Sequence, residues 1–466
     1  MKIIIKNMHI FSKDGEEDIF NFSESVNFIY GNVGTGKTTI LNLIMYGLGG
    51  KMINTPAIKK CFKAVQLEIL LNDMIFKFFR IANSNRIQID SLNDNHRISI
   101  NTSNISDFLF EKCNLPIRFQ STGNYEGKDI KLTFQNYSWF SYLKQSEMDN
   151  SFFNLHSDNM FKQNAAVDVM LSFLESDILV DRELNKYYKE QKRRLRQYED
   201  NKQVFKYVED IFYLKNSSQG ENVSLLIDSL KGRISKLINS KNLFYSEDIH
   251  ELLELQKDLV LVEQKRLFEN KKNRYFIELD TIRANIEKYE KNMKDEFFEH
   301  SYYAKNLYEI FLECLHKIEF QGINKYDTIK IDHKTHMPII TNEFEGKELS
   351  FENISSGGRK TLFKICFALA IHRFQHTKMN KNYLPSFLFI DTPMKNISER
   401  EDSNMYDNFY KYLFDTFSTE LEDTQLFVID KEKRNLTDYH FKDEAFIMRM
   451  THDDKLNPPL FKNYRE

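Results

Sequence analysis

The sequence predicts an α/β protein whose β-rich ends flank a long helical insertion. Strand-length apolar or alternating runs occur before about residue 90 and again after about residue 324. Between Ile117 and Met337 the chain has no proline. Because proline disrupts a helix interior by about 3 kcal/mol, so long a stretch without it is typical of helix. In the charge-rich segment from Arg182 to His300, apolar residues recur at heptad-like spacing, which favours paired helices.

Four strands and one helix are expected near the N-terminus. The strands correspond to the runs KIIIKNMHIF, SVNFIYG, AVQLEILL and MIFKFFRIA, which are short, apolar or alternating, and separated by polar turn residues. The helix extends from Thr38 to about Gly47 and follows the second strand.

The middle of the chain is predicted to be an antiparallel coiled-coil hairpin. A turn signal at 216–222 separates two charge-rich helical arms. The alternative is an ordinary globular bundle of the same helices. The apolar stripes are Tyr188, Leu195, Tyr198, Phe205 and Phe212 on one arm, and Leu252, Leu255, Leu259, Val262, Tyr275, Leu279, Ile282, Ile286, Tyr289 and Met293 on the other.

Strands return after about Asn324, in the runs TIKIDH, MPIIT, SFLFID and LFVID, and a helix is expected among them from Lys360 to about His376. Three parts follow from this pattern. They are an N-terminal lobe at 1–160, a helical arm at 161–310 with its apex near 216–222, and a C-terminal lobe at 311–466.

The composition argues against a basic nucleic-acid coat protein, a membrane protein and an exported protein. The chain has 466 residues, with 65 Lys and Arg against 68 Asp and Glu, and its net charge of -3 argues against a globally basic nucleic-acid coat protein. No run reaches the roughly 18 apolar residues of a membrane span. The first residues lack the apolar core of a signal peptide, so a cytoplasmic protein is expected. Four dispersed cysteines predict neither disulfides nor a zinc site.

A phosphate-binding loop is predicted between an apolar strand and a helix, and it has the pattern G-x-x-x-x-G-K-[ST]. Its glycines allow backbone N–H groups to converge on an anion, and the helix N-terminus adds partial positive charge. Lys37 would meet the β- and γ-phosphates, and the Thr38 hydroxyl suits Mg²⁺. The nucleotide-binding residues expected here are Gly31, Asn32, Val33, Gly34, Thr35, Gly36, Lys37, Thr38 and Thr39.

Two further motifs lie in the C-terminal lobe. Asp391 ends an apolar strand, where a carboxylate can contact Mg²⁺ at the carboxyl edge of an α/β sheet. Ser356, Gly357 and Gly358 precede a helix and form a second anion site from backbone N–H groups, a hydroxyl and the helix dipole. A plain helix cap is the alternative for the second motif. One chain therefore offers two phosphate sites with only one phosphate loop.

These motifs, with a helical hairpin between them, resemble the ATP-binding-cassette (ABC) ATPases of the SMC, RecF and RecN type. The resemblance covers about residues 1–160 and 310–435, and is closest to the short coiled-coil ATPases of bacterial DNA processing and phage defence, including the DndD group. It implies an ABC-type ATPase head made from both lobes, with ATP and Mg²⁺ as cofactors. Two heads would form a homodimer around two ATP molecules, the signature motif of each capping the nucleotide of the other.

The resemblance also assigns roles to individual residues. Ser356, Gly357 and Gly358 match the signature, Asp391 the magnesium acid, and Gln145 the glutamine that touches Mg²⁺ and the attacking water. The implied catalytic residues are thus Gln145, Ser356 and Asp391, and the implied metal ligands are Thr38, Gln145 and Asp391. Arg80 would either reach the phosphates, as in some relatives, or be an exposed arginine at a strand end.

Two departures from the family affect hydrolysis. Thr392 stands where most members have the glutamate that acts as general base, although the DndD-like branch also tends to read Asp-Thr-Pro. Losing a positioned base typically costs about 10²- to 10⁴-fold in rate. Either hydrolysis is slow or another acid such as Glu399 or Glu401 helps. Asp430 and Lys431 replace the expected switch histidine, whose role is either partly taken by Asp430 or absent.

The expected function is an SMC-like ATPase that hydrolyses ATP slowly and engages DNA, or controls a separate effector or nuclease subunit, in phage defence or DNA repair. The basic segments 189–194 and 265–274 are candidate DNA contacts or solvated helix faces. A zinc hook is excluded because no cysteine lies between Cys113 and Cys314. The alternative is a non-hydrolysing, ATP-dependent scaffold or sensor. A phosphotransferase is disfavoured because it would leave Ser356–Gly358 without a role.

Overall fold

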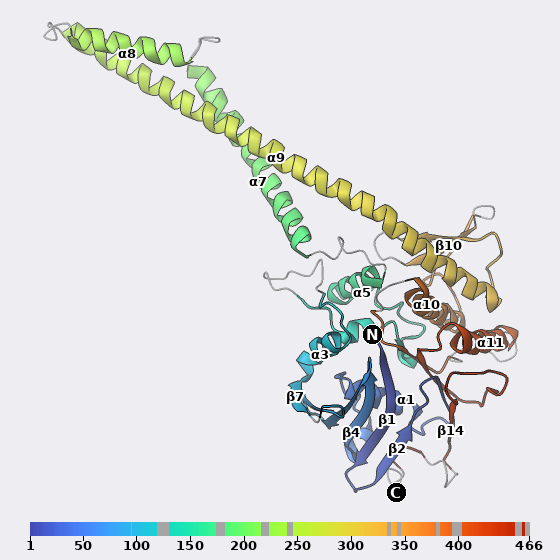
Figure 1. The fold of residues 1–466 in the computed structure, drawn as a ribbon. Coiled ribbons are helices and arrows are strands. Elements are labelled where there is room, and N and C mark those ends of the chain that lie inside the picture. The colour runs from blue at the N-terminus through green and yellow to red at the C-terminus, as the bar shows by residue number, and fades with distance from the viewer. Residues whose placement is uncertain are drawn as a thin grey trace. The chain divides into compact units, whose positions relative to one another are not determined.

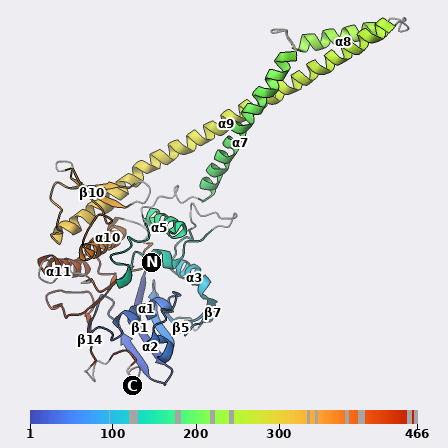
Figure 2. The same ribbon diagram turned by 180° about the vertical axis from the view of Figure 1, so that it is seen from behind.

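The computed structural model describes residues 1–94, 96–118, 130–155, 157–173, 182–215, 223–239, 246–332, 337–342, 346–378, 383–393, 403–452 and 459–461 (Figures 1 and 2). The chain forms two compact units. One comprises Met1–Val180 with Phe297–Glu466, and the other comprises Asp181–Glu296. Two segments far apart in the sequence therefore share one unit.

A six-stranded antiparallel sheet occupies the N-terminal part of the first unit. Along β4 buried and more exposed residues alternate, as expected for a sheet with one face toward the core. The strand order is β2-β1-β4-β5-β6-β7. The bounds are β1 Ile3–Ser12, β2 Glu17–Asn21, β4 Phe62–Leu71, β5 Met74–Ile81, β6 Arg86–Ser91 and β7 Arg97–Asn101.

A five-stranded parallel sheet joins the two ends of the sequence, which confirms the predicted α/β fold built from both lobes. Its order is β14-β3-β13-β12-β8. The middle strands β12 and β13 are buried throughout, as is typical of parallel sheets covered on both faces. The bounds are β3 Val26–Gly31, β8 Tyr142–Leu143, β12 Phe387–Asp391, β13 Gln425–Asp430 and β14 Phe446–Met450. A small antiparallel sheet has the order β11-β10-β9, with β9 Thr328–Ile331, β10 Pro338–Asn342 and β11 Lys347–Leu349.

Helix α10 (Gly357–Lys378) forms part of the core of the first unit. Every residue from Thr361 to Gln375 is buried, so the helix contacts other elements on all sides. The rings of Phe363 and Phe367 pack at 4.9 and 5.2 Å from that of Phe311, which lies on helix α9 (Ser246–Lys317). The other helices are α1 Lys37–Gly47, α2 Pro56–Cys61, α3 Ile105–Lys112, α4 Phe134–Ser138, α5 Met160–Phe173, α11 Ser403–Thr419, and the 3₁₀ turns η1 Thr102–Asn104 and η2 Gln145–Glu147.

The second unit consists of α7 (Arg182–Lys215), α8 (Val223–Asn239) and the first part of α9 (Ser246–Lys317). Stacked rings join α7 to α9 in antiparallel order: Tyr188 lies 4.2 Å from Tyr289, and Tyr198 lies 4.7 Å from Tyr275. This pairing confirms the predicted antiparallel arm.

The predicted apex at 216–222 lies outside the described residues. Because α8, which follows that segment, packs on α9 as α7 does, the chain reverses direction after α8 and not at the predicted apex. The contact is an apolar cluster of Ile227, Leu230, Leu255 and Val262, flanked by an ion pair of 3.0 Å between Lys231 and Glu263. None of the described helices combines the length and apolarity needed to cross a membrane. All four cysteines are buried and free.

We expect His372 on α10 to make folding dependent on pH. Burial, together with the N-terminal ammonium and His376, lowers the pKa of His372 to about 3. The unfolded chain takes up this proton near pH 6.5, so the free energy of unfolding should fall as the pH drops from there toward 3. This group contributes at most about 1.4 kcal/mol per pH unit.

Equilibrium denaturation of the wild type and His372→Gln between pH 7 and 4 measures this slope. The glutamine can keep a hydrogen bond to the Ser141 hydroxyl, which lies 3.1 Å from Nε2 of His372. In the variant, the free energy of unfolding should change less steeply with pH, by an amount that corresponds to the uptake of up to one proton on unfolding. Equal slopes in the two proteins would assign the acid sensitivity to other groups.

Candidate functional site

The register of the parallel sheet brings the predicted motifs to one edge. Gly31 at the end of β3 is paired with Met450, and Tyr30 is paired with Asp430 at the end of β13. Asp391 at the end of β12 is paired with Ile429. Because carboxyl ends of parallel strands meet at the same edge, residues more than 350 positions apart become neighbours.

The loop from Gly31 to Gly36 has the backbone that its glycines predict. Gly31 has φ 132°, and a Cβ there would lie 2.0 Å from the carbonyl oxygen of Met450. Gly36 has φ 97° and precedes the first turn of α1, which no side chain caps. The buried Thr35 hydroxyl donates to the Asn32 carbonyl at 2.9 Å and stabilises the loop from inside. The uncapped helix start provides N–H groups for an anion.

Lys37 is held inside the loop. Its Nζ donates to the carbonyls of Gly31 at 2.8 Å and Asn32 at 2.6 Å, and its side chain is buried. Burial lowers the pKa of Lys37, while the nearby carboxylates of Asp391 and Asp430 oppose this shift. The lysine is therefore a cation placed where phosphate oxygens of a nucleotide would meet the loop.

The donor set around Asp391 fits a magnesium ion. Oδ1 of this buried carboxylate accepts from the hydroxyls of Thr38 at 3.1 Å and Thr392 at 3.0 Å. Oδ2 is buried and has no side-chain hydrogen-bond partner in the described part of the chain. A buried carboxylate oxygen beside a threonine hydroxyl is a hard-oxygen arrangement that suits Mg²⁺, whose other ligands are commonly phosphates and water. Burial raises the pKa of Asp391, and the two hydroxyl bonds partly offset that rise.

Gln145 approaches the same site from β8, the strand next to β12. It begins the 3₁₀ turn η2, and its side chain is exposed and lines the pocket described below. Lys364 of α10 holds this segment, because its buried Nζ donates to the carbonyls of Glu147 at 2.8 Å and Ser151 at 2.6 Å. The segment that follows Gln145 is thus held by a lysine that no sequence motif singled out.

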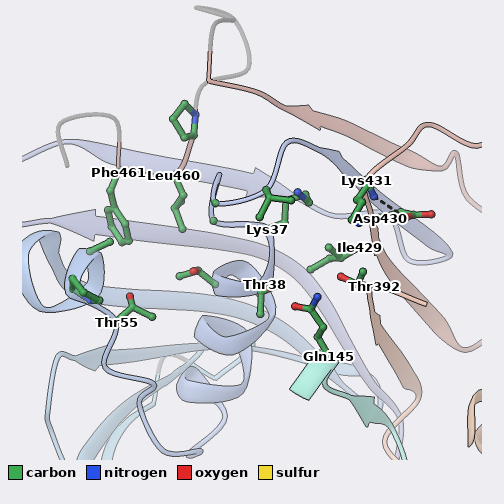
Figure 3. Close-up of a pocket in the computed structure, with 17 residues that line it drawn as sticks. Lys37, Thr38, Thr55, Gln145, Thr392, Ile429, Asp430, Lys431, Leu460 and Phe461 are labelled. Atoms are coloured by element: carbon green, nitrogen blue, oxygen red, sulfur yellow. Dashed lines mark hydrogen bonds between the residues drawn. The ribbon is translucent and has the colours of Figure 1, made fainter. Parts of the chain in front are cut away.

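A pocket of about 390 Å³ lies over the phosphate loop (Figure 3). One end holds polar side chains, among them Gln145, Thr392 and Asp430, while Thr55 and Phe461 lie at the other end. The loop and the start of α1 lie between them. Of the predicted nucleotide-site residues, Val33, Gly34, Gly36, Lys37, Thr38, Thr39 and Gln145 line it. The lining residues that were missed are Thr55, Pro56, Ala57, Pro459, Leu460 and Phe461.

The structure places Ser356, Gly357 and Gly358 at the start of α10 and not in the lining of this pocket. The backbone carbonyl of Ser356 accepts from the N–H of Lys360 at 3.0 Å, as the residue just before a helix does, and the neighbouring Ser355 is exposed. The two predicted phosphate sites of one chain are therefore separate.

Thr392 and Asp430, the residues that depart from the family pattern, are held by contacts within the chain. Asp430 accepts from the Tyr410 hydroxyl and from the N–H of Lys431, and burial raises the pKa of its carboxyl group. Thr392 has φ 63°, a strained value for a β-branched residue. Asp430 is the sole acidic side chain among the described residues that line the pocket. Glu399 and Glu401 lie outside the described residues.

Both expectations for Arg80 are wrong. The side chain is buried, and it does not line the pocket. NH1 donates to the carbonyls of Tyr46 at 2.6 Å and Gly50 at 2.8 Å, next to the C-terminal end of α1. A cation at this end stabilises the helix through its dipole, and the guanidinium also lies 3.7 Å from the centre of the Tyr46 ring. Arg80 supports the helix that follows the phosphate loop.

Comparison with known proteins gives a family and several similar folds. The family described as an AAA domain matches residues 2–306. No curated protein matches the chain significantly. An Smc head domain with an extended coiled coil from Pyrococcus furiosus, solved bound to the C-terminal domain of ScpA, is similar at 14% identity and a TM-score of 0.47, over 92% of this chain and 90% of that one. An Smc head domain with a coiled coil and joint from Pyrococcus yayanosii is similar at 16% identity and a TM-score of 0.41, over 92% of each chain.

We expect Asp391→Asn to weaken metal-dependent nucleotide binding without unfolding the protein. The amide oxygen can still accept both hydroxyl bonds, and removing a buried charge costs no desolvation, so thermal stability should be equal or higher. Losing the anionic ligand should weaken binding of ATP in Mg²⁺ by about tenfold or more, with little change in EDTA. Isothermal titration with and without Mg²⁺ measures this.

Asp430→Asn is the matched control, since it removes a buried carboxylate from the neighbouring strand end. It should lose stability, because the hydrogen bond from Tyr410 is weakened, and keep its Mg²⁺ dependence. A full magnesium response in Asp391→Asn would contradict the proposed ligand.

Proposed function

Because the chain belongs to the AAA domain family, we propose that it is an SMC-like ATPase head that binds ATP with Mg²⁺ over the loop Gly31–Thr39. The family match supports a nucleotide-binding AAA domain, in keeping with the predicted resemblance to ABC-type ATPases of the SMC group. The closer relation to the DndD group stays a prediction. The observation that carries the proposal is the convergence of Lys37, Thr38 and Asp391 at one sheet edge, beneath a pocket of about 390 Å³.

Each group has a role that follows from its geometry. The α1 N-terminus and the loop N–H groups bind phosphate oxygens, and the charge of Lys37 neutralises them. Thr38 and Asp391 would hold Mg²⁺, which when bound neutralises charge on the phosphate chain. The exposed Gln145 side chain at the polar end of the pocket would orient the attacking water. Residues at the ends of β3, β8 and β12 and at the start of α1 would thus bind the same phosphate chain.

A second copy of the chain would complete the site. Ser356, Gly357 and Gly358 do not line the pocket of their own chain, yet they form an N-terminal helix turn suited to an anion. A head-to-head homodimer would bring the signature of one copy to the nucleotide of the other. This arrangement gives both phosphate sites of the sequence a role.

Hydrolysis in such a dimer would be slow. Thr392 stands at the position of the usual general base, and Asp430, the acid among the described pocket residues, is hydrogen-bonded to Tyr410. Replacing a positioned base typically costs about 10²- to 10⁴-fold in rate. The same observation favours the second candidate function, a scaffold in which ATP binding alone stabilises the assembled state.

The proposal includes control of a separate effector or nuclease subunit in phage defence or DNA repair, with DNA as a candidate ligand. The basic residues of the second unit give this limited support. Arg193 pairs with Glu190 at 2.8 Å on the same helix, and Lys192 pairs with Glu290 at 3.4 Å across the helix pair. Such pairs are typical of a solvated helix face. They therefore favour control of an effector subunit over direct DNA contact by these residues.

The dimer is tested with two variants. Lys37→Ala should weaken ATP binding by about tenfold or more and abolish turnover, because it removes the cation of the loop. Ser356→Arg should leave ATP binding by one chain near wild type and abolish ATP-dependent dimerisation, because the altered residue lies outside that chain's own pocket. Nucleotide titration and size-exclusion chromatography with light scattering separate the two effects.

Ser99→Arg adds the same charge and bulk at an exposed position of β7 and serves as the control. If ATP promotes no dimer of the wild type, the two-copy site is refuted. Dimers without measurable turnover would select the scaffold over the ATPase.

A further inference from the structure

We propose that Pro459–Phe461, here named the strap, forms the wall against which the base of the bound nucleotide packs. The inference rests on the proposed ATP site and adds a base-binding subsite to it. Its starting point is the polarity of the pocket. Gln145, Thr392 and Asp430 lie at one end, and Leu460 and Phe461 lie with Thr55 at the other, with Lys37 and Thr38 between them (Figure 3).

The distribution of polar and apolar side chains in the pocket allows a nucleotide to bind in only one orientation. Its phosphates belong over Lys37 and Thr38, and its magnesium-binding end belongs beside Asp391, so the base extends toward the opposite end. That end is lined by Pro56 and Ala57 of α2 and by the strap. A flat aromatic base packs well against such apolar and aromatic side chains.

The strap is fastened to the phosphate loop. The N–H of Leu460 donates to the carbonyl of Thr35 at 2.9 Å. A Cβ on Gly36 would lie 2.6 Å from the Cβ of Leu460, so the strap lies against the loop where only glycine leaves room. Two contacts just before the strap hold the loop as well. The N–H of Asn32 donates to the Met450 carbonyl at 3.0 Å, and Nε2 of His452 lies 3.0 Å from the Val33 carbonyl.

Phe461 carries the aromatic surface of the strap. Its ring is buried, although the residue lines the pocket, and its backbone has φ 57°. A bulky residue rarely adopts this left-handed conformation, and such strain is found most often at ligand clamps and active sites. The pocket that the strap lines has an open volume of about 390 Å³ in total, which favours a wall over a plug that fills the place of the base.

The test compares ATP with inorganic tripolyphosphate, which offers the same phosphate groups and no base. In Phe461→Ala, the dissociation constant of ATP should rise about tenfold while that of tripolyphosphate stays unchanged. Phe461→Tyr, which keeps an aromatic ring, should bind ATP nearly as the wild type does. Isothermal titration in Mg²⁺ measures all affinities, and thermal unfolding checks that each variant is folded.

Phe441→Ala removes a ring from the same lobe outside the pocket and is the control. Unchanged ATP affinity in Phe461→Ala would overturn the inference, as would an equal loss for both ligands, which indicates a structural role. Tighter ATP binding would identify the strap as a plug and overturn it too. If the wild type binds tripolyphosphate but not ATP, the base subsite is refuted and the phosphate site is retained. If it binds neither, the proposed ATP site fails as well.

Discussion

The parallel register of β3, β13 and β12 is the constraint on which the rest of the site depends. Pairing Tyr30 with Asp430, and Ile429 with Asp391, places the phosphate loop and the acid strand at one edge. A shift of this register by one residue would turn the side chains to opposite faces and separate Thr38 from Asp391. The geometry of the site therefore depends on apolar strands that contribute few contacts to the ligand themselves.

The register is stabilised by burial and by polar contacts between distant segments. Gln425, fully buried at the start of β13, accepts from the N–H of Ile5 and donates to the carbonyls of Ile5 and Ser23. An unsatisfied amide in such a place costs about 1–3 kcal/mol, so these contacts disfavour alternative pairings. One side chain thereby connects the antiparallel sheet to the parallel sheet.

The local geometry of the phosphate loop and of the strand that ends in Asp391 could be predicted from the sequence, whereas contacts made by tertiary packing were misjudged or missed. The loop Gly31–Thr39 and the strand ending in Asp391 are contiguous, and their residue types are dictated by backbone geometry and charge. Arg80 was misjudged because its partners are carbonyls at the end of another helix. The strap was missed because a short apolar segment has no periodicity, and only the fold brings it to Gly36.

Lys364 links the movement of α10 to that of the segment after Gln145. Its nitrogen is buried, which lowers the pKa of Lys364 to about 8. Its hydrogen bonds go to the carbonyl of Glu147, on the turn that begins at Gln145, and to the carbonyl of Ser151 just after that turn. Sliding α10 along that turn would leave a buried cation without acceptors, which costs several kcal/mol. Lys364 therefore links the helix that begins after Ser356 to the segment that follows Gln145. We therefore expect a displacement of this helix to move the segment after Gln145 with it.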